Sequence, residues 1–314
     1  MSIDGFLNIL KPAGKTSFDI VAQIRRLTGE QRIGHAGTLD PDATGVLLIC
    51  IGQATRVIQY TLEMPKTYQA TIVLGITTDT YDASGKIIRT QDPSSIGIEQ
   101  ITQALSLFKG TIAQTPPMFS AIKHKGKRLY ELARSGIEVE REPKERYIYR
   151  LDVLQWIFPS VTIEVECSSG TYIRSLAHDL GEMLGCGAHL GSLVRIKCGN
   201  FDISHAISIP DLEKENRSGY GMNLIYPLDE ALLHWPAMIV DNECEKAIRN
   251  GKHFTIGNSQ NNNTYKNQRC RAYSSDGLLL ALLQWQPQEL LWHPFTVFCT
   301  QYATQEEFHL LSPS

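Results

Sequence analysis

The sequence predicts an α+β protein with a mixed, largely antiparallel sheet, helices on the faces of that sheet, and a small β-rich domain at the end. Strand-like segments outnumber helical ones and cluster without the regular β-α-β alternation of a parallel sheet. The length of 314 residues exceeds that of a typical single domain, and the composition changes after about residue 210. We therefore expect a larger domain over residues 1–232 and a smaller one over residues 235–314.

Hydrophobic spacing and turn residues place the elements of the larger domain in chain order. One helix should begin after Thr16 or Ser17, either of which can cap it, and should end at Gly29. The other expected helices are residues 54–62, 98–108 and 172–184. The expected strands are residues 7–10, 46–51, 67–76, 86–90, 147–158, 161–167 and 193–201.

The smaller domain is expected from short strand-like pieces near the end of the chain. The stretch DLEKENRSGYG before them indicates a polar linker or insert, and GNSQNNNTYKNQ (residues 257–268) indicates a polar loop. The strand-like pieces are residues 237–240, 270–273, 278–284 and 296–299. Together they predict a small β-rich unit.

The overall composition excludes several classes of protein. The net charge of −3 means that any site for a polyanion must be a local basic patch. The seven cysteines are odd in number and scattered, which is typical of reduced thiols and not of a disulfide framework. No apolar run reaches the ~18 residues of a membrane helix, and MSIDGFLNILKP lacks the regions of a signal peptide. We therefore expect a cytoplasmic protein with no membrane partner.

Two features mimic known ligand sites. The stretch PAGKT ends like a phosphate-binding P-loop, but Ile9 stands where that motif needs its first glycine. Without this glycine the backbone cannot wrap around a phosphate. The second feature is a group of possible zinc ligands, His178, Cys186, His189 and Cys198. Their spacing fits no standard zinc site, so no metal is expected.

Four short motifs could carry chemistry. They are the loop GHAGTLDPDATG around Asp40, the strand start KTY, the turn SGTYIR before a helix, and LVR in a later strand. Each has an ordinary explanation when it is taken alone. Asp40 before a proline can be a turn former, the tyrosines can lie at the edge of a core, and Arg174 can be a surface arginine of a helix.

Taken together, the motifs resemble a known family. GFLNILKPAGKTS, GHAGTLDPDATGVLLICIGQATR, KTYQA, PPMFSAIKHKGKRLYELARSGIEVER and CSSGTYIRSLAHDLGEMLGCGAHLGSLVR resemble the bacterial tRNA pseudouridine synthases of the TruB type, in order over residues 3–205. The chain departs from that family at Ala36, more often glycine or threonine there, and at Asp42, more often leucine. The resemblance implies the pseudouridine synthase fold and, more loosely, a PUA-like RNA-binding domain at the C-terminal end.

The resemblance also implies an activity and the residues that perform it. The activity is isomerisation of the uridine at position 55, in the T loop of tRNA, with no metal or organic cofactor. Asp40, Tyr68 and Arg174 would be the catalytic residues: the nucleophilic carboxylate, the tyrosine that stacks on the target base, and the ion-pair partner of the carboxylate. Asp42 could raise the pKa of Asp40 if it pointed inward, and we expect it to point to water.

Further residues would bind the substrate. By the same resemblance, Tyr172 and Leu193 complete the base pocket. His35 fills or supports the space left by the flipped nucleotide. An insertion at about residues 110–146 would grip the T arm of tRNA.

Local charge agrees with that last expectation. Residues 121–150 carry a net charge of +4, although a charged run alone is most often a solvated face. The RNA-backbone contacts are expected in a flexible stretch, from Lys123, Lys125, Lys127 and Arg128. Lys11 and Arg195 are expected to add to the same RNA-binding surface.

Two other functions stay open at this stage. One is a tRNA-binding or tRNA-folding protein in which catalysis is secondary. The other is a related, guide-RNA-dependent pseudouridine synthase, but such proteins usually have basic tails and partner proteins, and this chain has no such tail. We expect a monomer with no obligatory protein partner.

Overall fold

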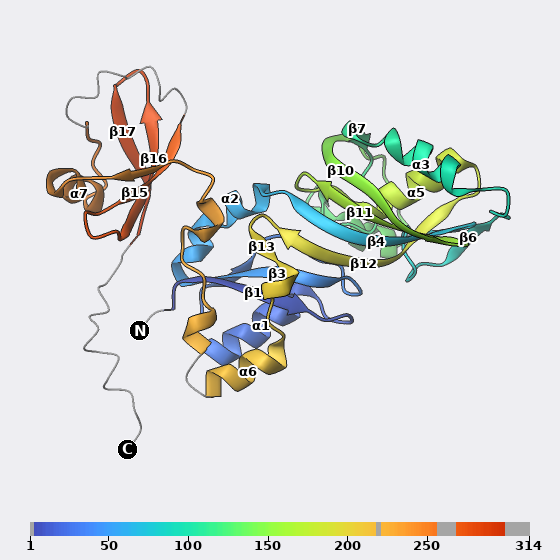
Figure 1. Cartoon of the computed structure of the whole chain (residues 1–314), viewed down its shortest axis with the longest axis horizontal. Helices are drawn as coiled ribbons and strands as arrows, with labels where there is room; N and C mark the ends of the chain where they lie inside the picture. The colour runs from blue at the N-terminus through green and yellow to red at the C-terminus, as the bar shows by residue number, and fades with distance from the viewer. Residues whose placement is uncertain (1–2, 218–220, 256–267, 299–314) are drawn as a thin grey trace. The chain divides into compact units, whose positions relative to one another are not determined.

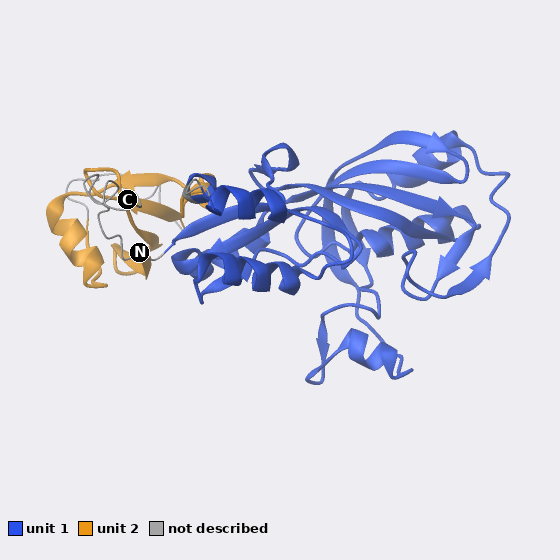
Figure 2. Cartoon of the chain, turned by 90° about the horizontal axis from the view of Figure 1, so that it is seen from below, with its two compact units in different colours: residues 1–225 blue, residues 226–314 orange. Residues whose placement is uncertain are grey.

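The computed structural model describes residues 3–217, 221–255 and 268–298. The chain divides into two compact units, Met1–Ile225 and Tyr226–Ser314, which Figure 2 shows in different colours. The boundary expected near residues 232–235 falls inside the second unit. Asp229 belongs there because its carboxylate accepts a hydrogen bond from the Tyr273 hydroxyl.

Unit 1 is built on a nine-stranded mixed sheet (Figure 1). Its main strand order is β1-β3-β12-β4-β11-β10-β7, with β2 paired to β3 and β13 paired to β12. All pairs are antiparallel except that of β12 with β3. This confirms the predicted mixed, largely antiparallel sheet. The strands are β1 Gly5–Lys11, β2 Ile33–His35, β3 Thr44–Ile51, β4 Lys66–Leu74, β7 Gly110–Gln114, β10 Lys144–Ile157, β11 Ser160–Cys167, β12 Ala188–Cys198 and β13 Phe201–Asp202.

Two hydrophobic clusters divide this unit. In one, α3 (Ile98–Ser106) and α5 (Ile173–Leu184) pack on β4, β10, β11 and β12. In the other, α1 (Ser17–Thr28) and α6 (Ile209–Arg217) pack on β1 and β3. Tyr68 and Leu193 contact both clusters, so the two expected pocket residues lie where the clusters meet.

Local sequence explains the helix that leads to the Asp40 loop. The Thr16 hydroxyl accepts a hydrogen bond from the Asp19 backbone N–H, and the Asp19 carboxylate accepts one from the Thr16 N–H. This capping box starts α1, and Gly29 ends it in the left-handed conformation with φ 70°. Both ends were predicted from the sequence.

Several expected elements differ from the structure. Residues 211–217 of the segment expected to be a polar linker or insert belong to helix α6, because Ile209 and Leu212 bury one stripe of that helix against the β1 cluster. Residues 54–62 divide into a 3-10 helix, Gly52–Val57, and α2, Ile58–Glu63. Strand β12 begins earlier than expected, at Ala188. The shorter elements β5 (Ile76–Thr78) and β6 (Ile87–Thr90) form a separate hairpin.

Unit 2 is the small β-rich domain that the sequence predicts. Its four-stranded sheet has the order β14-β15-β16-β17, and helix α7, which was not expected, packs on it. The bounds are β14 Ala237–Ile239, α7 Asn242–Arg249, β15 Arg269–Tyr273, β16 Leu279–Gln286 and β17 Leu291–Val297. The expected polar loop lies outside the described residues except for its last residue, and Cys299 lies outside them too.

Two of the candidate zinc ligands, His178 and His189, have other partners in the structure. His178 stacks on Tyr81 with ring centroids 3.9 Å apart, and the His189 Nδ1 lies 3.0 Å from the Ile76 carbonyl. Over the described ranges, no group of three His, Cys, Asp or Glu side chains could hold a metal ion. The same ranges contain no helix of the length and apolar character that crossing a membrane requires.

Candidate active site

A fully buried lysine holds the loop that carries Asp40. Lys11 ends β1, and its ammonium donates to the carbonyls of Pro12 at 2.9 Å, Pro41 at 2.8 Å and Ala43 at 2.7 Å. Burial lowers the pKa of this ammonium to about 8. Two of its three donors therefore hold the loop just after Asp40, at Pro41 and Ala43, and the third binds the carbonyl of Pro12, the residue after Lys11.

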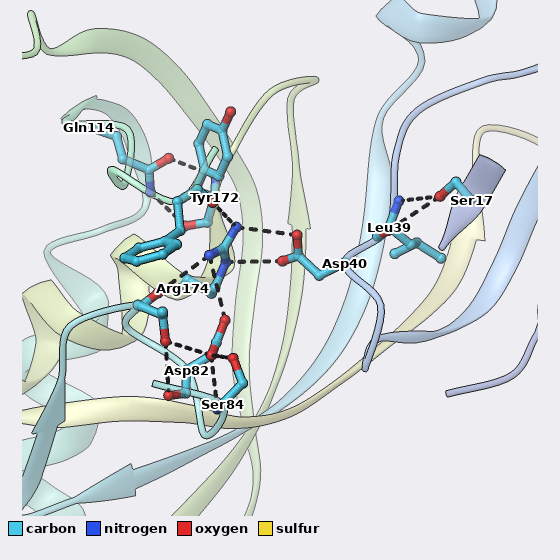
Figure 3. Close-up of polar contacts among 10 residues, drawn as sticks. Ser17, Leu39, Asp40, Asp82, Ser84, Gln114, Tyr172 and Arg174 are labelled. Atoms are coloured by element: carbon cyan, nitrogen blue, oxygen red, sulfur yellow. Dashed lines mark hydrogen bonds and ion pairs between the residues drawn. The ribbon is translucent and has the colours of Figure 1, made fainter. Parts of the chain in front are cut away.

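A second buried cation and a serine hold the loop at other points. The Arg195 guanidinium donates to Val46 O at 2.7 Å and to Gly37 O at 3.1 Å. The Ser17 hydroxyl accepts from the Leu39 N–H at 3.0 Å and lies 3.2 Å from the Leu39 carbonyl. Figure 3 shows Ser17 beside Leu39, next to Asp40. Side-chain hydrogen bonds therefore hold the loop at four of its residues, Gly37, Leu39, Pro41 and Ala43.

These contacts correct one expectation. Lys11 and Arg195 do not add to an exposed basic surface, because they are 0% and 1% exposed. The Arg195 guanidinium binds carbonyls of the Asp40 loop and of the adjoining strand β3, and the Lys11 ammonium binds two carbonyls of the loop and that of Pro12. We assign both a supporting role behind the loop.

Close packing at the start of β3 explains a glycine of the loop. Gly45 has φ 99°, and a Cβ there would lie 2.2 Å from the Arg195 carbonyl oxygen. Only glycine lets β12 approach β3 this closely in that conformation.

Asp40 forms a two-point ion pair with Arg174. The Arg174 Nε lies 3.0 Å from Asp40 Oδ2, and Nη2 lies 3.2 Å from Oδ1 (Figure 3). Arg174 is 6% exposed, and its Nη2 also donates to the Phe119 carbonyl at 2.9 Å. The Asp40 side chain is 42% exposed. The planar fork of arginine thus fixes both carboxylate oxygens while one side of Asp40 remains open to a ligand.

Asp82 is a second carboxylate on the same arginine, and sequence reasoning missed it. Its Oδ2 lies 3.5 Å from Arg174 Nη1. Its Oδ1 accepts hydrogen bonds from the Thr80 hydroxyl, the Ser84 N–H and the Ser84 hydroxyl (Figure 3). The sequence identified this segment only as a turn, and an aspartate that begins a turn gives no signal of a second role.

The site raises the pKa of Asp40. Burial is the largest cause, the Arg174 charge opposes it, and the Asp82 charge adds to it. Asp42 is exposed, as expected, and its charge is the smallest of the raising effects. The arrangement therefore holds a carboxylate that is oriented yet less stable as an anion than an ordinary aspartate.

Tyr68 lies on β4 opposite Arg195 of β12. Burial raises its pKa to about 12, so the phenol keeps its proton at neutral pH. Leu193 lies two residues before Arg195 on β12 and packs against the same two clusters as Tyr68. These two side chains form the apolar junction behind the loop.

Tyr172 and His35 flank this region from other elements. Tyr172 precedes α5, and its hydroxyl has a raised pKa from burial, with smaller effects from Ser120, Arg174 and Asp40. His35 ends β2, and burial together with the Arg195 charge lowers its pKa. A lowered pKa keeps the imidazole neutral at physiological pH.

The expected RNA-backbone residues are grouped on one hairpin of the insertion. Strands β8 (Lys123–His124) and β9 (Lys127–Arg128) pair across a two-residue turn. Both turn residues have positive φ, as a type I′ turn requires, so this stretch forms a β-hairpin. All four cationic side chains are exposed: Lys123, Lys125, Lys127 and Arg128.

Comparison with known proteins gives the family. The family described as "TruB family pseudouridylate synthase (N terminal domain)" matches residues 25–173, and "tRNA pseudouridylate synthase B C-terminal domain" matches residues 174–233. A protein of Clostridium kluyveri called tRNA pseudouridine synthase B is 46% identical over 249 residues, which are 79% of this chain and 84% of that protein.

Solved structures have the same fold. A chain in the structure of an H/ACA RNP bound to a substrate RNA containing 2′-deoxyuridine matches with a TM-score of 0.71 and 25% identity, over 94% of this chain and 85% of that one. A chain in a Cbf5-Nop10-Gar1 complex matches with a TM-score of 0.70 and 26% identity, over 95% and 84%.

A further relative covers nearly all of the chain. The tRNA pseudouridine synthase B of Dehalococcoides mccartyi is 42% identical over 299 residues, which are 95% of this chain and 98% of that protein. Identity at this level over this length establishes that the chain belongs to the TruB family of pseudouridylate synthases, which are isomerases.

Proposed function

We propose that this enzyme converts the uridine at position 55, in the T loop of tRNA, to pseudouridine, with Asp40 as the nucleophile. The observation that carries the proposal is the two-point ion pair between Arg174 and Asp40, which leaves the carboxylate oriented and accessible. Relatives named tRNA pseudouridine synthase B at 42–46% identity support tRNA as the substrate. Such a substrate also favours action in the cytoplasm.

The chemistry requires a carboxylate and no redox step. The N1–C1′ bond of the uridine breaks, the uracil turns, and a bond forms between C5 and C1′. The hydrogen on C5 leaves as a proton and N1 gains one, so the product is an isomer of the substrate. Ionised Asp40 can attack C1′ or C6, or stabilise positive charge on the sugar, as carboxylates do in glycosidases.

The neighbouring residues have roles that fit their environment. A target uridine must leave the folded T loop, at a cost of a few kcal/mol. Tyr68 can stack on the detached uracil, which contributes about 1–3 kcal/mol, and its protonated phenol is available for proton transfer. Tyr172 and Leu193 complete the base pocket, and His35 supports the space that the flipped nucleotide leaves.

The guide-RNA-dependent alternative has weaker support. The chains that match within RNP complexes are 25–26% identical to this one, whereas the bacterial tRNA enzymes are 42–46% identical. We therefore propose that the chain recognises its tRNA directly, without an obligatory protein partner.

The site of modification can be tested with two transcripts of one tRNA, both labelled with tritium at C5 of uridine. One is the natural sequence, and in the other cytidine replaces the uridine at position 55. The enzyme should release tritium from the first transcript and none from the second. Equal release from both would exclude position 55 as the target.

The pH dependence of the rate should reflect the Asp40 environment. Asp40 acts as an anion, and the fold raises its pKa above the ordinary value of 3.8. The single-turnover rate constant should therefore fall as pH decreases, with a midpoint above 3.8. Asp82→Asn removes a charge that raises this pKa, so it should move the midpoint to lower pH while slowing the reaction. A midpoint that stays in place in Asp82→Asn would contradict this electrostatic link.

The exposed hairpin should contribute affinity but not chemistry. Replacing Lys123 and Lys127 by glutamine should raise KM for tRNA and leave kcat within about twofold of wild type. The slope of log KM against log salt should become shallower by about one unit for each phosphate that the hairpin no longer neutralises. Lys214→Gln, at an exposed position on α6, is the matched control and should change neither quantity. An unchanged salt slope in the hairpin variants would exclude phosphate contacts there.

A further inference from the structure

A buried glutamine joins the root of the insertion to the start of α5. Gln114 is the last residue of β7 and is 2% exposed. Its Nε2 donates to the Tyr172 carbonyl at 2.9 Å, and its Oε1 accepts from the Tyr172 N–H at 2.7 Å (Figure 3). The side-chain amide therefore pairs with both backbone polar groups of one residue, as a neighbouring strand would.

Gln114 gives a partner to one N–H at the start of α5, a helix end that has no side-chain cap of its own. Tyr172 is the N-cap residue and makes no capping hydrogen bond with its side chain. The first N–H groups of a helix have no partners within it, and the Gln114 amide instead fixes the residue that leads into the helix. Arg174 follows two residues later. The contact therefore also fixes the backbone position from which the Arg174 side chain extends towards Asp40.

Two more hydrogen bonds link the same pair of segments. The Ser175 hydroxyl donates to the Thr115 carbonyl at 2.9 Å, and Arg174 Nη2 donates to the Phe119 carbonyl at 2.9 Å. Residues 114–119 lead out of β7 into the insertion that bears the basic hairpin. Gln114 also pairs with Lys144 of β10, where the chain returns from the insertion. The root of the insertion is therefore bound to the turn that presents Arg174.

We propose that Gln114 is a positioning residue that couples the insertion to the two-point ion pair between Arg174 and Asp40. It acts by holding the start of α5 against the root of the insertion, and it has no contact with the reacting atoms. This inference rests on the proposed function, because its effect is read as a change in the rate of pseudouridine formation.

Two substitutions separate the polar contacts from the filling of space. Gln114→Met keeps a side chain of similar length and removes both hydrogen bonds. It should lower the single-turnover rate constant about 10²-fold, the size expected when a reacting group is misplaced by about 1 Å. The Kd for tRNA should stay within about twofold of wild type, since the exposed hairpin is unchanged. Gln103→Met, on the exposed face of α3, is the matched control.

Gln114→Glu adds a pH readout that a loss of folding would not give. A protonated glutamic acid can accept from the Tyr172 N–H and donate to its carbonyl, whereas the ionised form cannot donate. Burial should raise the pKa of this new carboxyl group. The ratio of the Gln114→Glu rate constant to that of wild type should therefore be near one at acid pH and fall as pH rises. The ratio for Gln103→Glu should not depend on pH.

The assay uses an excess of enzyme over tritiated tRNA, so that the rate constant reports only folded molecules. A flat ratio for Gln114→Glu, or a Gln114→Met rate constant within about twofold of wild type, would overturn the coupling. Wild-type enzyme that releases no tritium would instead overturn the proposed function. The two failures are therefore distinguishable in one experiment.

Discussion

Replacing Arg174 by lysine is expected to lower the single-turnover rate constant by about 10²- to 10³-fold. Lysine keeps the positive charge but lacks the planar fork that contacts both Asp40 oxygens, at 3.0 and 3.2 Å. It also cannot hold Asp40, Asp82 and the Phe119 carbonyl at the same time in this geometry. The lost orientation, and not a lost charge, is the reason for the slower reaction.

The same substitution should change the pH profile in a defined direction. The Arg174 charge lowers the pKa of Asp40, in opposition to burial. A weaker pairing should raise that pKa, so activity on the acid side should be lost at a higher pH than in wild type. Arg150→Lys, at a half-exposed ion pair on β10, is the control and should leave rate and profile unchanged. Full activity in Arg174→Lys would show that a point charge is sufficient.

The sequence predicted most of what local chemistry determines. The cap at Thr16, the end at Gly29 and the paired strands β10 and β11 follow from side-chain types within a few residues. The pairing of Asp40 with Arg174 joins residues that are 134 positions apart. Local patterns cannot indicate such a contact, and the family resemblance supplied it.

Of the supporting residues, Lys11 and Arg195 were expected at an exposed RNA-binding surface, and Asp82 and Gln114 were not singled out at all. Lys11 and Arg195 look like surface cations in sequence, since cations are rarely fully buried. Here backbone carbonyl groups of Pro12, of the loop and of β3 replace water as their partners. Asp82 and Gln114 belong to a turn and a strand end, where their residue types are ordinary. Only the folded chain brings them to Arg174 and Tyr172.

Helix α6 shows a different limit of sequence reasoning. Its segment is rich in charged residues, and only Ile209 and Leu212 are buried. Two apolar positions are too few to establish a helical period. Packing on the β1 cluster, together with the hydrogen bond between Ser208 and Asp211, stabilises a helix there.

Replacing Asp40 by asparagine is expected to abolish conversion while tRNA still binds. The amide is nearly the same size but is not a nucleophile, so the rate constant should fall by more than about 10⁴-fold. Removing a negative charge beside an anionic ligand should not weaken binding. The fold raises the pKa of Asp40, so its charged form is destabilised relative to the unfolded chain. We therefore expect a melting temperature equal to or above that of wild type.

Asp42→Asn is the matched control for that substitution. It removes one carboxylate from the same loop, two residues away, at an exposed position. Its effect on the Asp40 pKa is the smallest of the raising effects, so its rate constant should stay within about threefold of wild type.

The decisive measurement is tritium release from tRNA labelled at C5 of uridine, under single turnover, with tRNA binding measured on the same proteins. Wild type and Asp42→Asn should release tritium at similar rates, and Asp40→Asn should bind the tRNA and release none. Release by Asp40→Asn at a rate near that of wild type would contradict a nucleophilic role for Asp40.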